Sequence, residues 1–209
     1  IGSGATNENQ SLAVAAISLS PSVVPNPTVS YISPNPTGSI SLQPAPGASG
    51  SAVIVVTVDD GSSLNNLITR TFTVIVNGPP VFGGISSQTI NEDSASALIP
   101  FTVTDPESPS SSISVTAISS NPGLIPNGNI ALGGTTQNRT ISFAPVTNQF
   151  GTTTITLTAS DPDGNVSTTN FLVTVNPVND PPTLTAIPNL TVNENSGPTN
   201  VPLAGISAG

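Results

Sequence analysis

The sequence repeats itself at a spacing of about 101 residues, and this repeat limits the possible folds more than any other feature. Four pairs of segments correspond in order along the chain. The pairs are 12–18 with 113–119, 39–42 with 140–143, 53–57 with 154–158, and 72–77 with 171–176. A repeat of this length is the size of a small domain. The sequence therefore predicts two related domains rather than one large core.

The boundaries of the repeats do not coincide with the ends of the chain. A complete copy, 79–180, opens with a segment that runs from Pro79-Pro80 to Asn91-Glu92-Asp93. The first copy, 1–78, has no such opening, but a matching one lies at 181–209. We predict that 1–78 is a repeat without its first strands, that 79–180 is complete, and that 181–209 is the opening of a further repeat that completes the 1–78 part of the next copy.

Alternation of apolar and hydroxyl residues predicts β-strands. The stretches TFTVIV at 71–76 and TITLTA at 154–159 place Val, Ile, Leu or Phe at every second position. This period of two is typical of strands with one buried face. The 22 Pro and 18 Gly interrupt the windows that a helix would need. The sequence predicts an all-β fold with no significant helix.

Missing residue types exclude much of enzyme chemistry. The chain has no Cys, His, Met, Trp or Lys, and its formal charge is −9. Catalytic triads, Cys-His pairs, zinc sites of the usual ligands and disulfides are therefore excluded. Two basic residues, Arg70 and Arg139, are too few to neutralise nucleic acid phosphates. Carboxylate chemistry, calcium binding or a purely structural role remain.

Several short motifs resemble those of one family. They are INED at 90–93, VTDPE at 103–107, LTASDPDG at 157–164, FLVTV at 171–175 and NPVNDPP at 176–182. Together these motifs resemble the tandem cadherin-like and dystroglycan-type Ig-like repeats of large bacterial surface proteins. The resemblance implies tandem Greek-key β-sandwiches with their ends at opposite poles, and an extracellular, cell-surface location. The first copy departs from the pattern, because it ends in NGPP at 77–80 without the Val-Asn-Asp linker.

The resemblance also implies calcium at the junctions between repeats, where cadherins hold it. Calcium requires six to eight oxygen ligands, so acids from several loops must converge. The first predicted junction combines Glu194, Asp105, Glu107, Asp161 and Asp163; the second combines Glu92, Asn179, Asp180, Asp59 and Asp60. The alternative is that Asp-Pro-Asp-Gly at 161–164 is an ordinary turn and that the glutamates are simply solvated.

The cut repeat leaves three arrangements open. The chain is one period of a longer covalent array, or separate subunits complete one another by donating strands, or one domain keeps an exposed edge. Residue 1 is not Met and the sequence contains no signal peptide, so we interpret the chain as a mature or excised segment. The expected partners are identical repeats or subunits, arranged head-to-tail.

These features predict a structural repeat unit of an extracellular bacterial fibre, stalk or adhesin shaft, and not an enzyme. A carbohydrate-binding β-sandwich module is the alternative, although such modules usually stack sugars on Trp or Tyr and this chain has only Tyr31. The inward strand positions of Phe72, Phe143 and Phe171 predict that these three rings lie in the core.

Overall fold

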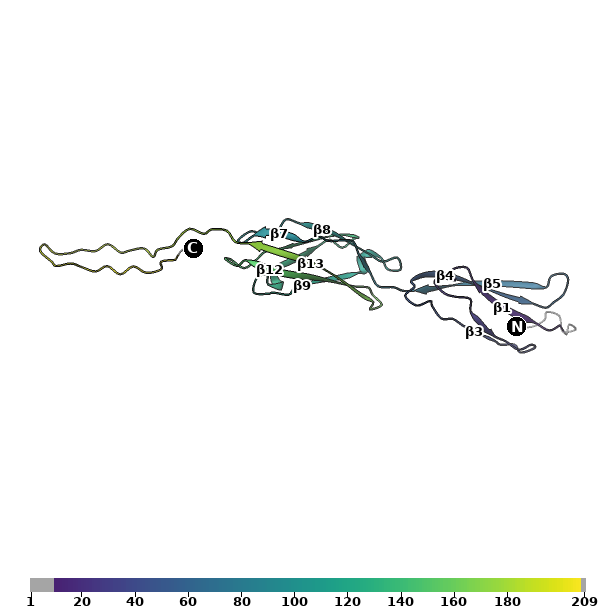
Figure 1. Ribbon diagram of the computed structural model, residues 1–209. Coiled ribbons are helices and arrows are strands. Elements are labelled where there is room, and N and C mark those ends of the chain that lie inside the picture. The colour runs from purple at the N-terminus through teal and green to yellow at the C-terminus, as the bar shows by residue number, and fades with distance from the viewer. Residues whose placement is uncertain (1–9, 208–209) are drawn as a thin grey trace.

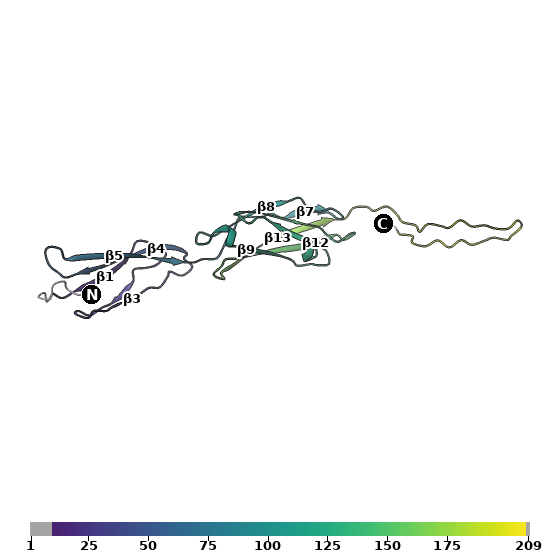
Figure 2. The same ribbon diagram turned by 180° about the vertical axis from the view of Figure 1, so that it is seen from behind.

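The computed structural model describes residues 10–207, which form an elongated molecule (Figure 1). Two β-sandwiches lie end to end, and a long two-limbed loop extends beyond the second one; the view from behind in Figure 2 shows the same order. The described part of the chain contains no α-helix, so the all-β prediction is confirmed. Correspondingly, no helix within 10–207 is long and apolar enough to cross a membrane.

The first sandwich is small and is built from five strands. They are β1 (Ala13–Ser18), β2 (Thr28–Ser30), β3 (Ser39–Ser41), β4 (Gly50–Asp59) and β5 (Leu67–Val76). β4 lies between β1 and β5 in one antiparallel sheet, and β2 pairs with β3 in a second one. Its buried apolar residues are Ala16, Val24, Ala52 and Ile54.

The second sandwich has two four-stranded sheets. Its strands are β6 (Val81–Phe82), β7 (Gln88–Asn91), β8 (Ile99–Thr104), β9 (Ser114–Ser119), β10 (Ile130–Gly133), β11 (Asn138–Phe143), β12 (Gly151–Ser160) and β13 (Val166–Asn176), with 3₁₀ turns η1 (Ser110–Ser112) and η2 (Asn127–Asn129). The sheet orders are β10-β11-β8-β6 and β7-β13-β12-β9. Every second residue of β12 is buried, as the alternating pattern predicts.

The repeat in the sequence is also a repeat of strands. β1, β3, β4 and β5 are the equivalents of β9, β11, β12 and β13. Residues 10–76 contain no equivalent of β6, β7 or β8. Phe143 and Phe171 are buried as predicted, but the prediction for Phe72 is wrong: its ring is 41% exposed. The reason is that the strands that cover Phe171 have no counterpart over Phe72.

The final segment, residues 181–207, is called here the C-terminal arm. Its two limbs run side by side away from the second sandwich (Figure 1). The backbone N–H of Thr183 donates to Ser207 O at 3.1 Å, and that of Thr185 donates to Ala204 O at 2.9 Å. Every residue of the arm is exposed, so it packs on neither sandwich.

Candidate metal site between the two sandwiches

The linker between the sandwiches is held by acidic side chains of the second one. Asn77, directly after β5, donates from Nδ2 to Asp161 Oδ2 at 2.7 Å and to Asp163 Oδ2 at 3.1 Å. The backbone N–H of Gly78 donates to Glu107 Oε2 at 3.4 Å. Three acids of the first predicted junction therefore meet the incoming linker in this structure.

Gly78 is the residue that allows this close approach. It is buried, and a Cβ at this position would lie 2.6 Å from Ser49 Cβ of the first sandwich, closer than carbon atoms pack. The departure of the first linker from the family pattern thus has a steric reason. Because Gly78 has no side chain, Ser49 of the first sandwich and Glu107 of the second can both approach the linker at this residue.

Asp161 organises the turn between β12 and β13. Its Oδ1 accepts the Asn165 backbone N–H at 2.8 Å, its Oδ2 accepts Asn165 Nδ2 at 3.0 Å, and Gly164 supplies the positive φ of 91° that the turn needs. Burial desolvates the Asp161 carboxylate and acts to raise its pKa. Hydrogen bonds from Asn165, Asn77 and Gly164 outweigh this, and they hold the pKa of Asp161 below its ordinary value.

Asp105 lies at the same pole, at the end of β8. It is 9% exposed, and its Oδ1 accepts the backbone N–H groups of Glu107 at 2.8 Å and Ser108 at 3.0 Å. Its Oδ2 is buried and has no hydrogen-bond partner among the described residues; the same holds for Asn77 Oδ1. Buried oxygens are normally satisfied, so these two are free to accept a further ligand.

The donor set at this pole has the chemistry that calcium prefers, namely hard carboxylate and amide oxygens. Within residues 10–207, however, no three acidic side chains are gathered closely enough to surround a metal ion. The amide of Asn77 stands between Asp161 and Asp163 and satisfies them by hydrogen bonding. Glu194, the fifth residue of the first predicted junction, lies in the C-terminal arm, which projects from the opposite pole of the second sandwich.

The residues of the second predicted junction are divided between the outer poles of the two sandwiches. Glu92 is 5% exposed, and its Oε1 accepts the Val178 backbone N–H at 2.6 Å, so it anchors the outgoing linker that contains Asn179 and Asp180. Asp59 is the last residue of β4 and Asp60 begins the turn that follows it, at the far pole of the first sandwich. One chain does not bring these two groups together, so this junction stays a prediction about neighbouring copies.

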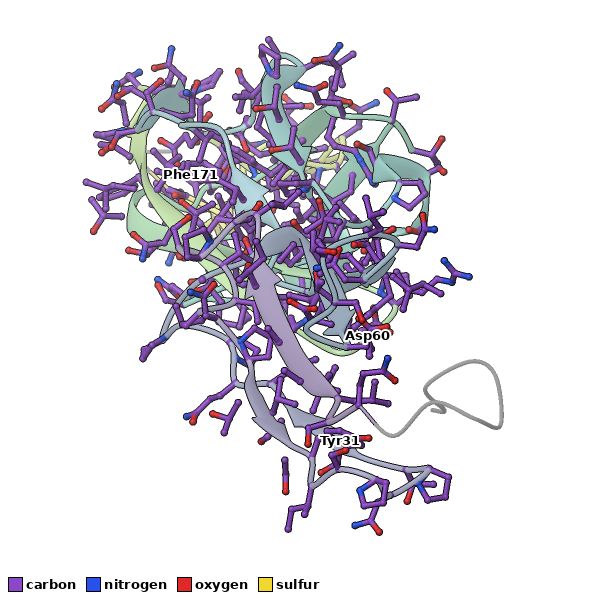
Figure 3. All side chains as sticks on the ribbon, turned by 90° about the vertical axis from the view of Figure 1, so that its right-hand side faces the viewer. Tyr31, Asp60 and Phe171 are labelled. Atoms are coloured by element: carbon purple, nitrogen blue, oxygen red, sulfur yellow. The ribbon has the colours of Figure 1, made fainter. Side chains whose placement is uncertain are left out.

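The carboxylates of Asp59 and Asp60 are occupied by their own turn. Asp59 Oδ1 accepts the Gly61 backbone N–H at 2.7 Å, and Asp60 Oδ1 accepts that of Ser62 at 2.9 Å. Figure 3 views the molecule from this end, with Asp60 and Tyr31 on the first sandwich and Phe171 on the second. The local bonds are those of ordinary Asx turns.

Asn77 is the contact that the sequence analysis did not identify. It is the last residue before the linker, and its equivalent in the second repeat is Asn176, so a strand-ending Asn recurs at each junction. That recurrence was the available signal. An isolated Asn carries no charge, however, so it does not stand out as a ligand among the acidic residues.

Comparison with known proteins gives one family match. Residues 77–174 match the family model described as the bacterial Ig domain. This range covers the second sandwich except for the last two residues of β13, and it begins at Asn77. No curated protein sequence matches the chain significantly.

Solved structures with similar architecture are distant in sequence. The human desmocollin-1 ectodomain is 15% identical with a TM-score of 0.46, over 84% of this chain and 36% of that one. A protocadherin gammaB7 EC3-6 cis-dimer is 16% identical with a TM-score of 0.47, over 96% and 50%. Domains 4 and 5 of the S-layer protein SbsC are 18% identical with a TM-score of 0.35, over 78% and 75%. The chain thus spans half or less of the desmocollin and protocadherin structures.

Proposed function

Because residues 77–174 match the model of the bacterial Ig domain, we propose that this chain is a structural repeat of an extracellular bacterial fibre, stalk or adhesin shaft. Its role is mechanical rather than catalytic: it sets reach and spacing along a chain of identical repeats joined head-to-tail. Calcium binds at the junction between sandwiches and stiffens it.

The observation that carries this proposal is the linear arrangement with a polar junction. The two sandwiches lie along one line, and the short linker between them is hydrogen-bonded to the second sandwich through Asn77 and Gly78 (Figures 1 and 2). A linker held in this way transmits force and direction. A flexible tether would instead keep its backbone free and rich in Gly and Ser.

The calcium ligands we propose are the carboxylates of Asp105, Glu107, Asp161 and Asp163, together with the Asn77 amide oxygen. Two observations support this set. The buried Asp105 Oδ2 and Asn77 Oδ1 have no partner within the described chain, and the lowered pKa of Asp161 keeps that carboxylate charged at neutral pH. Bound calcium would supply positive charge beside these four carboxylates.

Calorimetric titration of the whole chain with calcium chloride tests the site. We expect binding with a Kd of about 0.1–1 mM, the range of extracellular calcium modules. D105N should abolish the heat because it removes the unpartnered oxygen. D93N is the matched control, since Asp93 belongs to neither junction and its carboxylate bonds, within the described residues, only to the Asn148 backbone N–H. Absence of heat at millimolar calcium would rule out the calcium part of the proposal.

Imaging of the native assembly tests the structural role. A beaded filament with a period of roughly 80–90 Å, two sandwiches long by strand-rise arithmetic, is the expected result. Separate globular particles would contradict the proposal. The carbohydrate-binding alternative gains no support from the groove of about 330 Å³ beside Pro25 and Pro46, because none of the residues that line it is aromatic.

A further inference from the structure

We propose that the C-terminal arm of one copy completes the first sandwich of a second copy, adding strands to the free edges of β3 and β5. This inference rests on the head-to-tail assembly proposed above, and it names the surfaces that join. The partner is a second copy of this chain, whether or not the two copies are also covalently linked.

The first sandwich has an open side where the second one is closed. In the second sandwich, β7 pairs with β13 and β8 pairs with β11. The equivalents of β13 and β11 are β5 and β3, and within the described residues neither has a strand on its outer edge. Unpaired strand edges favour the addition of another chain.

The open side also exposes apolar surface. Phe72 is 41% exposed, although its equivalent Phe171 is 3% exposed. A cavity of about 120 Å³ opens between the two sheets beside Val29, Tyr31 and Ile40, and the Tyr31 hydroxyl is buried without a hydrogen-bond partner in the described part of the chain. These features are those of half a core whose covering layer is missing.

The arm has the apolar residues of that missing layer. Leu184, Val192, Val201 and Leu203 occupy the repeat positions of Phe82, Ile90, Ile99 and Phe101, which pack in or against the core of the second sandwich. In the arm these four side chains are 42–55% exposed. An alternating apolar face that covers nothing is unfavourable in water, so the arm also requires a partner.

The arm has the backbone conformation of the missing layer as well. Its hydrogen bond from Thr185 N–H to Ala204 O, at 2.9 Å, is the equivalent of the bond from Gly83 N–H to Thr102 O, at 2.8 Å. Asn195 has a φ of 61°, and its equivalent Asp93 has a φ of 59°. The same turn therefore follows the equivalent of β7 in both places, and docking requires little rearrangement.

The pairing register follows from the complete repeat. β13 pairs with β7 from Val173 opposite Gln88 to Asn176 opposite Asn91. The equivalent pairing in the first sandwich runs from Val74 opposite Leu190 to Asn77 opposite Asn193. Similarly, the pair of Thr140 with Pro100 becomes Ser39 with Pro202.

In this register, Glu194 of one copy lies at the junction between the two sandwiches of the next copy. Asn193 comes opposite Asn77, and the next arm residue, Glu194, then reaches the linker as Glu92 does in the second sandwich. The first predicted junction would thereby gain its fifth acid, from the neighbouring copy. Strand addition and the proposed calcium site thus meet at one place.

The arm and the open side cannot meet within one chain. The arm projects from one end of the molecule, and the first sandwich forms the other end, with the second sandwich between them (Figures 1 and 2). Only a second copy can bring the two together. Because each copy has one arm and one open side at opposite ends, the assembly is an open chain rather than a closed pair.

Cysteine crosslinking of the full chain tests the register, since the chain has no Cys of its own. Directly paired strand residues lie within disulfide distance. The double variant S39C/P202C, oxidised and run on a denaturing gel, should give a ladder at multiples of 20.8 kDa that reduction collapses. The matched control is S39C/T183C. The equivalent of Thr183 is Val81, which pairs with Thr104 of β8. Thr104 lies four residues, or about 13 Å, along β8 from Pro100, so no bridge should form.

A second measurement does not depend on introduced cysteines. Sedimentation of the unmodified chain should show concentration-dependent polymers, and a synthetic peptide of residues 181–207 should reduce them to monomers. L203D should weaken assembly by about 10- to 100-fold in Kd, because it places a charge opposite Gly38 beside the cavity. Monomers at all concentrations, an internal disulfide, or dimers with nothing larger would each overturn the inference. Calcium binding that persists without polymers would leave the proposed junction intact and refute only strand addition.

Discussion

Phe171 in β13 is 3% exposed, whereas its sequence equivalent Phe72 in β5 is 41% exposed. The two rings occupy the same position of the repeat and are followed by closely similar residues. The difference comes from three strands. In the second sandwich, β7 flanks β13 in its own sheet, and β8 and β6 extend the opposite sheet; residues 10–76 contain no equivalents of these strands. The alternating pattern of a strand thus predicts which of its faces is apolar. That face is buried only where other strands cover it.

The same contrast holds for polar side chains. Arg139 is 8% exposed, and its guanidinium donates to four backbone oxygens, those of Ser110, Ile113, Gly134 and Thr136. The equivalent position in the first sandwich is Gly38. The second sandwich therefore has a cation that joins the loops at one pole, and the first sandwich has an open groove there.

The largest expected effect is the difference in stability loss between alanine variants of Phe171 and Phe72. F171A should lower the free energy of unfolding of the second sandwich by about 3–5 kcal/mol, because it empties a packed core. F72A should lower the free energy of unfolding of the first sandwich by about 1 kcal/mol in the isolated chain, because the Phe72 ring is already partly exposed. Urea unfolding followed separately for each sandwich measures both. Equal losses in monomeric protein would contradict the open-side interpretation, and the losses should converge once the arm peptide is added.

Replacement of Arg139 should have the next largest effect. R139M keeps much of the side-chain volume but leaves four carbonyl oxygens without their donor, and we expect a loss of about 2–4 kcal/mol. R70M is the matched control, since Arg70 is exposed and, among residues 10–207, its side chain bonds only to Thr69 O. It should change stability by less than about 0.5 kcal/mol. Comparable losses in both variants would show that charge, rather than the hydrogen bonds, stabilises this pole.

The two equivalent glutamates should differ by a smaller amount. E92Q weakens a charge-assisted bond to the Val178 N–H and should cost about 1–2 kcal/mol. E194Q should have no effect on the monomer because Glu194 is exposed. Amide hydrogen exchange at Val178 reports the first effect. If the arm docks as proposed, E194Q should destabilise polymers while leaving monomers unchanged.

The smallest effect concerns pH at the junction. The pKa of Asp161 is lowered in the folded chain, so its charged form stabilises the junction above the unfolded pKa of about 3.9. That contribution is lost as the pH falls from about 4 through the lowered folded value. NMR titration of the Asp161 carboxyl carbon measures it, and D161N should remove the pH dependence. A midpoint above 3.9 would contradict the hydrogen-bond assignment.

The alternation of Thr with Val and Ile was sufficient to predict the strands, because a period of two is a local property. The acidic turns were also predictable, since Asp-Pro-Asp-Gly forms its turn from its own residues. Asn77 was not, because its role depends on two carboxylates 84 and 86 residues away. The exposure of Phe72 was missed for a similar reason: the pattern of one strand contains no information about the strand that faces it.

By itself, the sequence determined the repeat, its phase and the apolar face of each strand, since these depend on residue order alone. Only the tertiary structure decided which repeat has a closed core, which acids meet the linker, and which end carries the arm. These outcomes depend on contacts between residues far apart in the chain. Burial and hydrogen bonding each require two surfaces, and the order of residues within one segment does not specify which other segment packs against it.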